Sequence, residues 1–529
     1  MKNSLIRPMS NEFFEYLRDE SRTIGNAESI SFPKSEADVI DILRDIYPKG
    51  IPITIQGGRT GLAAGAVPNG GHIMNLSRMN SITAMRCDEK GDFFIALQPG
   101  VALSQLRKQI ESRKFDTSQW SEESKEAFLE FCKAPEHFFS PDPTETSATI
   151  GGMVSCNASG ARSYYYGPTR KHITALRIVL CDGQTLAIRR GELFADGRIL
   201  NLSTEQGASI KVELPTYKMP KTKNASGYYI EDNMDAIDLF IGSDGTLGII
   251  TEIEVKLLPL PQVIWGVSCF FERERDAIEF VVAVRKQLKC VAVIEFFDGD
   301  ALTILRCQKA QNKAFSQLPA VEERMNAAIY IEIHCEDEKT AVETIMKIGS
   351  IMKESGGCEE NTWVARNDSD RNQLLFFRHA IPESVNMLID QRKKLDPIIT
   401  KLGTDMSVPD KHLRYIMNMY HSTLQEMGLQ SAIWGHIGDN HLHVNILPRS
   451  KEDYNLGKKL YEQWAIEVTK LGGAVSAEHG TGKLKANFLT VMYGQNHIDE
   501  MASLKAAFDP KTLLGAGNMF ILRKEGECK

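Results

Sequence analysis

Glycine is distributed unevenly along this chain, and its bunches constrain the fold more than any other feature of the sequence. Many of the 40 glycines fall in five short stretches, at residues 57–71, 151–167, 242–248, 435–438 and 472–482. Glycine reaches backbone conformations that other residues avoid, and it lets a segment approach another segment or a ligand closely. The sequence therefore predicts five sharp or closely packed turns, three in the first half of the chain and two in the second.

Length and composition narrow the classes of protein that remain. At 529 residues the chain is too long for one hydrophobic core, so two or three domains are expected. The 62 basic and 69 acidic residues give a net charge of −7, which argues against a nucleic-acid partner and against a polybasic membrane anchor. No apolar run approaches the roughly 20 residues that a membrane helix needs, and the first residues lack the apolar core of a signal peptide.

The ten cysteines are scattered along the chain without a CxxC pair. This pattern disfavours a disulfide framework, a zinc ribbon and a built-in iron–sulfur cluster, and it favours free thiols in a reducing compartment. We therefore expect a cytoplasmic protein. Peripheral contact with the inner face of a membrane is left open, because the sequence offers no strong anchor.

Hydrophobic periodicity predicts an α+β protein whose organisation changes near residue 262. A capped helix from Ser35 and short strands over 51–55, 73–76, 93–98, 173–189 and 238–260 come first, and the polar helical segment 115–137 has the pattern of an insertion. After the prolines at 259 and 261, strands at 265–271, 291–297 and 327–335 alternate with helices. We expect a first domain over 1–262, a second over 263–480 and a C-terminal segment over 481–529.

The first glycine turn follows a strand in PITIQGGRTGLAAGAVP (52–68). Successive free backbone N–H groups in such a turn can hold an anion such as a pyrophosphate. The motif is not a Walker loop and lacks GxGxxG spacing, so taken alone it is better explained as an ordinary glycine turn. Two further turns, in the segments 141–167 and 241–251, favour a bound cofactor, because three such turns in one domain are hard to attribute to coincidence.

These three segments carry a resemblance. GGRTGLAAGA, PDPTETSATIGGMVSCNASGARSYYYG and GSDGTLGIITE are together similar to the flavin domain of the vanillyl-alcohol-oxidase-type flavoproteins, in particular to the branch of the D-lactate, glycolate and D-2-hydroxyglutarate dehydrogenases. The similarity runs from about residue 30 to 523. It implies a two-subdomain, PCMH-type FAD-binding domain, then an α+β substrate (cap) domain with an antiparallel sheet, and a C-terminal segment that packs back on the flavin domain. Some members bind flavin covalently through a histidine in the first turn, and Arg59 and Thr60 there imply noncovalent FAD instead.

The residues that the resemblance assigns to FAD lie in the three turns and in two flanking segments. They are Gln56, Gly57, Gly58, Arg59, Thr60, Gly61, Leu62, Gly65, Ala66, Pro99, Gly100, Pro141, Thr146, Thr149, Ile150, Gly151, Gly152, Asn157, Ser159, Gly160, Tyr166, Gly242, Gly245, Thr246, Gly248, Ile249, Ile250 and Asn518.

Histidines gather in a second motif, WGHIGDNHLHVNILP. His436 and His443 are seven residues apart, a spacing that fits a loop rising into a strand, on which His441, His443 and Asn445 would share one face. Glu478 follows in the segment SAEHG, and two imidazoles with a carboxylate are a common ligand set for a divalent metal with an open position. The resemblance makes His436, His443 and Glu478 the metal ligands, with zinc expected or else manganese, iron or cobalt.

His441 departs from the family pattern. Relatives often read GHxGDGNxHxN, and this chain has Asn440-His441 where Gly-Asn is common. A third imidazole either competes with His443 as a ligand or points away, and the sequence does not decide between these alternatives.

Three more residues complete the expected site. By the resemblance His479 is the general base, Asn445 lies near the substrate, and Arg378 binds the substrate carboxylate through its planar fork. Relatives that use dicarboxylates carry a lysine where this chain has Gly403, so a second carboxylate clamp is less assured.

These parts predict FAD-dependent oxidation of a D-2-hydroxy acid such as D-lactate to the 2-keto acid. His479 would take the hydroxyl proton and flavin N5 the hydride, with a metal polarising the hydroxyl. Electrons would pass to an external quinone, cytochrome or electron-transfer flavoprotein, and a homodimer is left open. The alternatives are another flavoenzyme of the superfamily, either an oxidase or an enzyme like alkylglycerone-phosphate synthase, and a metallohydrolase, which would leave the three glycine turns unexplained.

Overall fold

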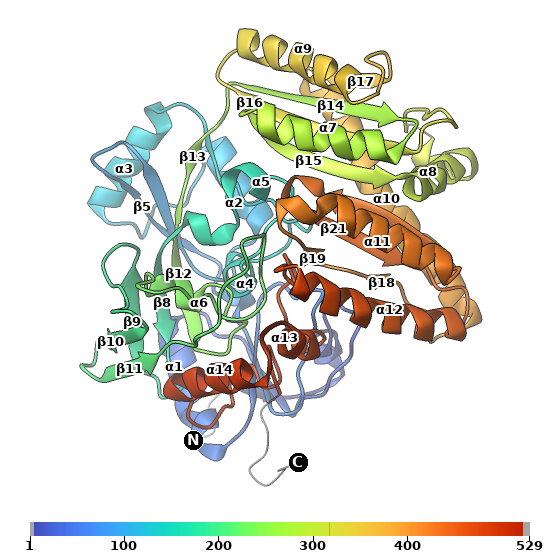
Figure 1. The fold of residues 1–529 in the computed structure, drawn as a ribbon. Helices are drawn as coiled ribbons and strands as arrows, with labels where there is room; N and C mark the ends of the chain where they lie inside the picture. The colour runs from blue at the N-terminus through green and yellow to red at the C-terminus, as the bar shows by residue number, and fades with distance from the viewer. Residues whose placement is uncertain (1–4, 317, 522–529) are drawn as a thin grey trace.

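The computed structural model describes residues 5–316 and 318–521 (Figure 1). Residues 1–4 of the predicted first domain and residues 522–529 of the predicted C-terminal segment, among them Cys528, lie outside the described residues. The chain begins with a small sheet in the order β1-β2-β4-β3, in which β4 pairs in parallel with both neighbours. Its strands are β1 (Ile6–Pro8), β2 (Ser29–Ser31), β3 (Ile53–Gln56) and β4 (His72–Asn75).

Helix α1 (Glu36–Ile46) covers this sheet, and its start follows from local chemistry. The Ser35 side chain accepts a hydrogen bond from the Asp38 N–H, and the Asp38 side chain returns the contact, which completes the predicted capping box. The apolar stripe of α1 is buried against Ile53 and Met74 of the sheet. This packing fixes where β3 ends, and the first glycine turn begins there.

A five-stranded antiparallel sheet in the order β5-β6-β12-β8-β9 forms the second layer of this half. Helix α3 (Glu122–Lys133), in the segment predicted as an insertion, packs on it through Phe131, whose ring centroid lies 5.2 Å from that of Phe93. The other elements are β5 (Ile82–Cys87), β6 (Phe93–Leu97), α2 (Leu103–Ser112), α4 (Ile150–Cys156), β8 (Ile173–Val179), β9 (Thr185–Arg189) and β12 (Ile249–Lys256). Shorter elements are β7 (His137–Phe138), α5 (Ser163–Tyr166), β10 (Ile199–Ser203), β11 (Ser209–Glu213), α6 (Ile237–Phe240) and β13 (Leu258–Pro259).

A larger, antiparallel sheet dominates the second half. Its strands are β14 (Val263–Phe271), β15 (Val291–Asp298), β16 (Ala327–Cys335), β17 (Thr362–Ala365), β18 (Leu402–Gly403), β19 (Met406–Ser407), β20 (Ser431–His436) and β21 (His441–Ile446). Along β16 the side chains of Ile329, Ile331 and Ile333 enter one core, while Ala328 and Tyr330 enter the other. The sheet is therefore buried on both faces, which explains the near-continuous apolar runs in its sequence.

Helices cover both faces of this sheet (Figure 1). The core on one face is shared with α7 (Glu274–Gln287), α9 (Glu338–Glu354), α11 (Leu413–Glu426) and α12 (Lys451–Lys470). The core on the other face is shared with α8 (Gly299–Gln311) and α10 (Asp368–Leu395). The mixture of helices with antiparallel sheets confirms the predicted α+β class.

The C-terminal segment returns to the first half of the molecule, where α13 (Ala486–Tyr493) and α14 (Gln495–Phe508) lie beside it in Figure 1. The anchor is Asp509, whose carboxylate accepts hydrogen bonds from Lys505 Nζ at 2.9 Å, from the Tyr47 hydroxyl at 2.7 Å and from the Leu514 N–H at 2.8 Å. Asp509 and Lys505 are both buried. This arrangement brings Leu513 next to β3, where the Ile53 N–H donates to the Leu513 carbonyl oxygen at 2.8 Å.

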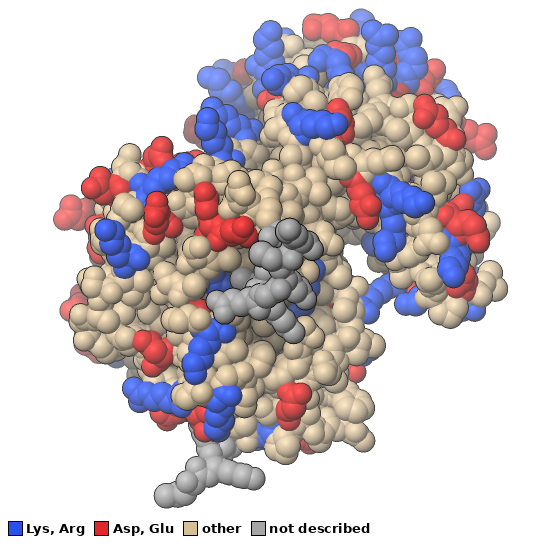
Figure 2. Space-filling model, turned by 60° about the horizontal axis from the view of Figure 1, so that its bottom comes forward, with Lys and Arg blue, Asp and Glu red and all other residues tan. Residues whose placement is uncertain are grey.

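Surface features agree with the composition. On the face shown in Figure 2 the basic and acidic side chains are interspersed. No helix among the described residues is long and apolar enough to cross a membrane. The nine cysteines within the described ranges are all free thiols.

Asp509→Ala tests the anchor of the C-terminal segment. Removing one partner of a buried ion pair costs about 3–5 kcal/mol, because the Lys505 ammonium is left without its counter-charge. We expect a lower urea midpoint, followed by tryptophan fluorescence, and an Asp499→Ala control on the exposed face of α14 should change stability by no more than about 0.5 kcal/mol. Equal midpoints for the two variants would show that the pair does not hold the segment.

Candidate active site

The first two glycine turns pack directly against each other. A Cβ atom at Gly57, in the turn after β3, would lie 2.3 Å from Thr149 Oγ1. Thr149 caps α4, and its Oγ1 accepts from the N–H groups of Gly152 and of Gly58, each at 3.3 Å. The backbone of the β3–β4 turn thus reaches the N-terminus of α4 only because glycine occupies this position.

The third turn closes the same region from the other end of α4. The Gly242 N–H donates to Val154 O at 2.9 Å, and the Asp244 N–H donates to Ser155 O at 2.8 Å. Burial raises the pKa of Asp244 to about 6, although the Gly482 N–H donates to its carboxylate at 2.8 Å. The Asp244 carboxylate therefore connects the third turn to a segment 238 residues further along the chain.

Asn518 extends this meeting point to the C-terminal segment. Its Nδ2 donates to Gly65 O at 3.1 Å and to Asp244 O at 3.0 Å, so it joins the first and third turns.

Several residues assigned to the cofactor have structural partners instead of a free surface. Gly248 packs against Ile178, Gly100 against Leu76 O, and the side chains of Ile150, Ile249 and Ile250 are buried in cores. Gln56 holds the first turn by donating to Ala66 O at 2.7 Å, and the Tyr166 hydroxyl lies 2.6 Å from His334 Nδ1. The Arg59 guanidinium stacks over the Tyr16 ring at 4.4 Å. For these residues the structure shows contacts within the protein, and their contact with FAD stays a prediction from the resemblance.

The imidazoles come together at the β20–β21 hairpin. His436, at the end of β20, is the register partner of His441, at the start of β21, and His443 follows two residues later. One donor atom each from His436, His441, His443 and Glu478 lie within 4.8 Å of one another. We call these four residues the His/Glu cluster. Glu478 Oε2 lies 3.2 Å from His436 Nε2 and 3.2 Å from His441 Nδ1.

Each imidazole faces an acceptor on the side away from Glu478. His436 Nδ1 bonds to Glu295 Oε1 at 2.5 Å, and His443 Nδ1 lies 3.1 Å from the carbonyl oxygen of Thr404. His441 Nε2 lies 2.9 Å from Asp405 Oδ1. An acceptor behind a histidine holds the proton on that ring nitrogen and leaves the other as a lone-pair donor, which is the arrangement found around protein-bound metals.

Charged groups compensate the buried Glu478. The Lys223 ammonium donates to Glu478 Oε2 at 3.0 Å and to Gly160 O, in the second glycine turn, at 3.2 Å. Burial alone would raise the pKa of Glu478, but Lys223 and His436 hold it well below its usual value. Burial would likewise lower the pKa of His436, yet the Glu295 and Glu478 carboxylates raise it to about 9.

His479 lies at the edge of the His/Glu cluster. Its ring is parallel to that of His443, with centroids 5.5 Å apart, and its Nδ1 lies 3.5 Å from Asp405 Oδ2. Partial burial lowers the pKa of His479 to about 4, so the ring is neutral at pH 7 and able to accept a proton. The next residue, Gly480, has a φ of +72° and approaches Cys156 of α4, which places His479 beside the cofactor turns.

The structure also places the other two predicted residues near the cluster. Arg378 of α10 donates from Nε to Glu295 Oε2 at 3.2 Å, so Glu295 joins it to His436. Asn445 is buried, donates to His443 O at 3.0 Å, and pairs in register with Gly403, the position at which dicarboxylate-using relatives carry a lysine.

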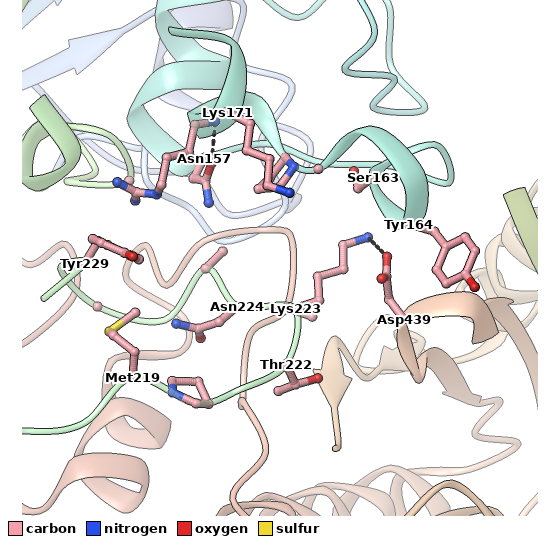
Figure 3. Close-up of a pocket in the computed structure, with 18 of the residues that line it drawn as sticks. Asn157, Ser163, Tyr164, Lys171, Met219, Thr222, Lys223, Asn224, Tyr229 and Asp439 are labelled. Atoms are coloured by element: carbon pink, nitrogen blue, oxygen red, sulfur yellow. Dashed lines mark hydrogen bonds and ion pairs between the residues drawn. The ribbon is translucent and has the colours of Figure 1, made fainter. Parts of the chain in front are cut away.

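A cavity of about 370 Å³ adjoins this region (Figure 3). Its walls join Asn157 and Gly242 of the cofactor turns to Asp439 and Ala477 of the second half, and Lys223 points toward Asp439 across it in Figure 3. The three imidazoles and Arg378 are not part of its lining. The cavity therefore borders Lys223, which donates to Glu478, but no residue of the His/Glu cluster lines it.

Sequence reasoning missed three charged residues of the site. Glu295 is a carboxylate in the otherwise apolar strand VAVIEFFD, and a charge at that position is a signal of a buried partner. Asp405 follows two residues after Gly403, and its local sequence does not show that it is buried. Lys223, in KTKNASGYY, has no sequence signal that separates it from a surface lysine.

Comparisons with known proteins agree with this geometry. Residues 260–519 match the family described as FAD linked oxidases, C-terminal domain, and residues 27–119 and 126–189 match the FAD binding domain. The chain is 25% identical to D-lactate dehydrogenase of Anaerostipes hadrus, over 98% of this chain and 94% of that protein. It is 26% identical to glycolate oxidase subunit GlcD of Bacillus subtilis (93% and 89% covered) and 26% identical to D-2-hydroxyglutarate dehydrogenase of Stutzerimonas stutzeri (96% and 94% covered).

Solved structures share the fold. A 4-ethylphenol oxidase from Gulosibacter chungangensis superposes with a TM-score of 0.64 at 18% identity, over 98% of this chain and 94% of that one. An alkyldihydroxyacetonephosphate synthase gives 0.63 at 14% identity, over 97% and 82%. These likenesses confirm the predicted PCMH-type FAD-binding fold. The chain belongs to the FAD-linked oxidases and is an oxidoreductase of the D-lactate, glycolate and D-2-hydroxyglutarate dehydrogenase type.

Proposed function

We propose that this protein oxidises a D-2-hydroxy acid of the D-lactate kind to the 2-keto acid and passes the electrons to an external acceptor. The observation that carries the proposal is the position of the His/Glu cluster and His479 beside the cofactor turns, with Lys223 bonded to both Gly160 and Glu478. A neutral imidazole, a set of metal-ligating atoms and a flavin cleft are the parts that oxidation of an alcohol next to a carboxylate requires.

The cleft fits FAD. The glycines at 57 and 58 let the backbone of the first turn pack against Thr149 and Ser147 at the start of α4, and the hydroxyl oxygens of Ser159 and Thr481 are buried without a hydrogen-bond partner among the described residues. Orphaned polar atoms of this kind point to a polar ligand. When bound, FAD accepts the hydride from the substrate carbon. The first turn has no histidine, so we propose noncovalent binding.

The His/Glu cluster fits a divalent cation. It offers imidazole nitrogens and a carboxylate oxygen within 4.8 Å, and two of the imidazoles are held by Glu295 and Thr404 in the tautomer that a metal requires. A bound divalent metal would supply Lewis acidity at the substrate hydroxyl. Zinc, manganese, iron and cobalt all accept this type of donor set.

The chain's own residues bind and deprotonate the substrate. Arg378 would hold the carboxylate through the guanidinium nitrogens that Glu295 does not use. His479 takes the hydroxyl proton while Asp405 fixes the orientation of its ring, and loss of that proton with a hydride converts the C–OH group to a ketone. Gly403, the register partner of Asn445, supplies no cation of its own, so a monocarboxylate is favoured over a dicarboxylate.

The electron acceptor separates this proposal from its closest alternative. An oxidase of the same fold would pass electrons to oxygen and release peroxide, whereas a dehydrogenase would reduce a quinone, a cytochrome, an electron-transfer flavoprotein or a dye. The test is anaerobic mixing with a panel of D- and L-2-hydroxy acids while flavin absorbance is followed, then reoxidation with and without oxygen. Failure of every 2-hydroxy acid to bleach the flavin would reject the proposal. The metallohydrolase alternative is set aside because the chain is an oxidoreductase.

Gly57→Ala tests the flavin cleft. The added Cβ would lie 2.3 Å from Thr149 Oγ1, so the first turn must shift away from α4. Overpacking of this kind costs about 1–3 kcal/mol. We expect FAD to bind about 5- to 150-fold more weakly, which corresponds to that free energy. FAD retained after gel filtration reports the loss. Gly349→Ala in α9, where the Cβ meets only the flexible end of Glu359, is the matched control. Unchanged retention in the Gly57 variant would place the cofactor elsewhere.

His479→Ala tests the base. We expect FAD to remain bound and the rate of flavin reduction by the hydroxy acid to fall about 10²- to 10⁴-fold, because the proposed base is removed. His497→Ala, on the partly exposed face of α14, should reduce flavin at the rate of the unchanged protein. Normal reduction in the His479 variant would contradict the assignment.

A further inference from the structure

The proposed function assigns no separate role to His441. It is fully buried. Its Nδ1 lies 3.2 Å from Glu478 Oε2 and its Nε2 2.9 Å from Asp405 Oδ1, yet neither nitrogen makes a hydrogen bond of good geometry with any described residue. A buried imidazole without satisfied nitrogens is costly, so its surroundings call for a further partner.

We propose that His441 is a fourth protein ligand of the metal, which makes the site a three-histidine, one-glutamate centre. Its Nδ1 faces Glu478 and belongs to the set of donor atoms that lie within 4.8 Å of one another. The inference rests on the metal in the proposed function, and it adds a ligand at a position where similar proteins commonly carry asparagine.

Asp405 supplies the outer partner that this ligand needs. One oxygen of its carboxylate, Oδ2, accepts hydrogen bonds from the Ser476 hydroxyl, from the Lys485 ammonium and from the backbone N–H of His479. The other oxygen, Oδ1, has no hydrogen bond to any described residue and lies beside His441 Nε2. A proton on Nε2 would satisfy that oxygen and leave the Nδ1 lone pair for a cation.

Four protein donors restrict which coordination the metal can have. A tetrahedral zinc ion with four protein ligands is closed, as in structural sites, and a catalytic ion needs at least one open position. A three-histidine, one-glutamate centre that acts on a hydroxy acid therefore requires a metal that accepts five or six ligands, and manganese, iron or cobalt meets this requirement more readily than zinc.

Metal affinity of the FAD-loaded protein tests the inference without any turnover. Co²⁺ binding is measured by competition with a coloured chelator for the unchanged protein and for His441→Asn, His443→Asn and His497→Asn. If His441 is a ligand, its variant loses more affinity than the about 10–100-fold expected for an outer partner and matches the His443 variant, while the His497 variant stays unchanged. FAD content shows that each variant is folded.

X-ray absorption of the unchanged protein loaded with Co²⁺ keeps the test decisive if His441→Asn does not fold. Three imidazoles around cobalt support the inference, and two overturn it. Equal Co²⁺ affinity of the His441 variant and the unchanged protein would also overturn it, but would leave the proposed function intact. Absence of Co²⁺ binding by the unchanged protein would instead reject the metal in the proposed function, and this inference with it.

Discussion

The arrangement of the site depends on the burial of the Glu478 carboxylate where the two halves of the molecule meet. Moving a carboxylate out of water costs several kcal/mol, and only close opposite charge and hydrogen bonds repay it. Lys223 from the first half and His436 from the second both contact Glu478 Oε2, at 3.0 and 3.2 Å. The same oxygen is thus held from both halves. If one half moved relative to the other, the Glu478 carboxylate would lose a partner that offsets the free-energy cost of its burial.

Around Glu478 carboxylates alternate with basic side chains. Glu295 separates Arg378 from His436, and Asp405 lies between His441 and His479. The Glu295 and Glu478 carboxylates raise the pKa of His436 to about 9, so a proton supplies the positive charge at this position when no cation is present. A divalent cation can supply that charge instead by displacing the proton, because metal ligands bind in their deprotonated form. Asp405 also means that His441, the proposed ligand, and His479, the proposed base, share one neighbouring carboxylate.

The sequence predicted those parts of the fold and site that local patterns determine. The capping box of α1 and the alternating strands after residue 262 depend on neighbouring residues, and both were recognised. The strand that carries His441 and His443 was predicted for the same reason, because a period of two puts both residues on one face. Its pairing with β20, which ends at His436, was not predicted.

What the sequence could not provide are contacts between distant segments. Glu295 meets His436 across 141 positions, and Lys223 meets Glu478 across 255. No periodicity encodes such pairs, because each depends on how β15, β20 and the loop around Lys223 pack in three dimensions. The role of His441 stayed open for the same reason, since Asp405 reaches it only through the pairing of β19 with β21.

The central claim is that a cation in the His/Glu cluster and the flavin act on one substrate. The direct measurement is anaerobic flavin reduction by D-lactate after a chelator has removed metal from the FAD-loaded protein. We predict that the metal-free protein retains FAD but is not reduced, and that reduction returns on addition of Mn²⁺ or Co²⁺. Reduction of the metal-free protein at the rate of the metal-loaded protein would contradict the account.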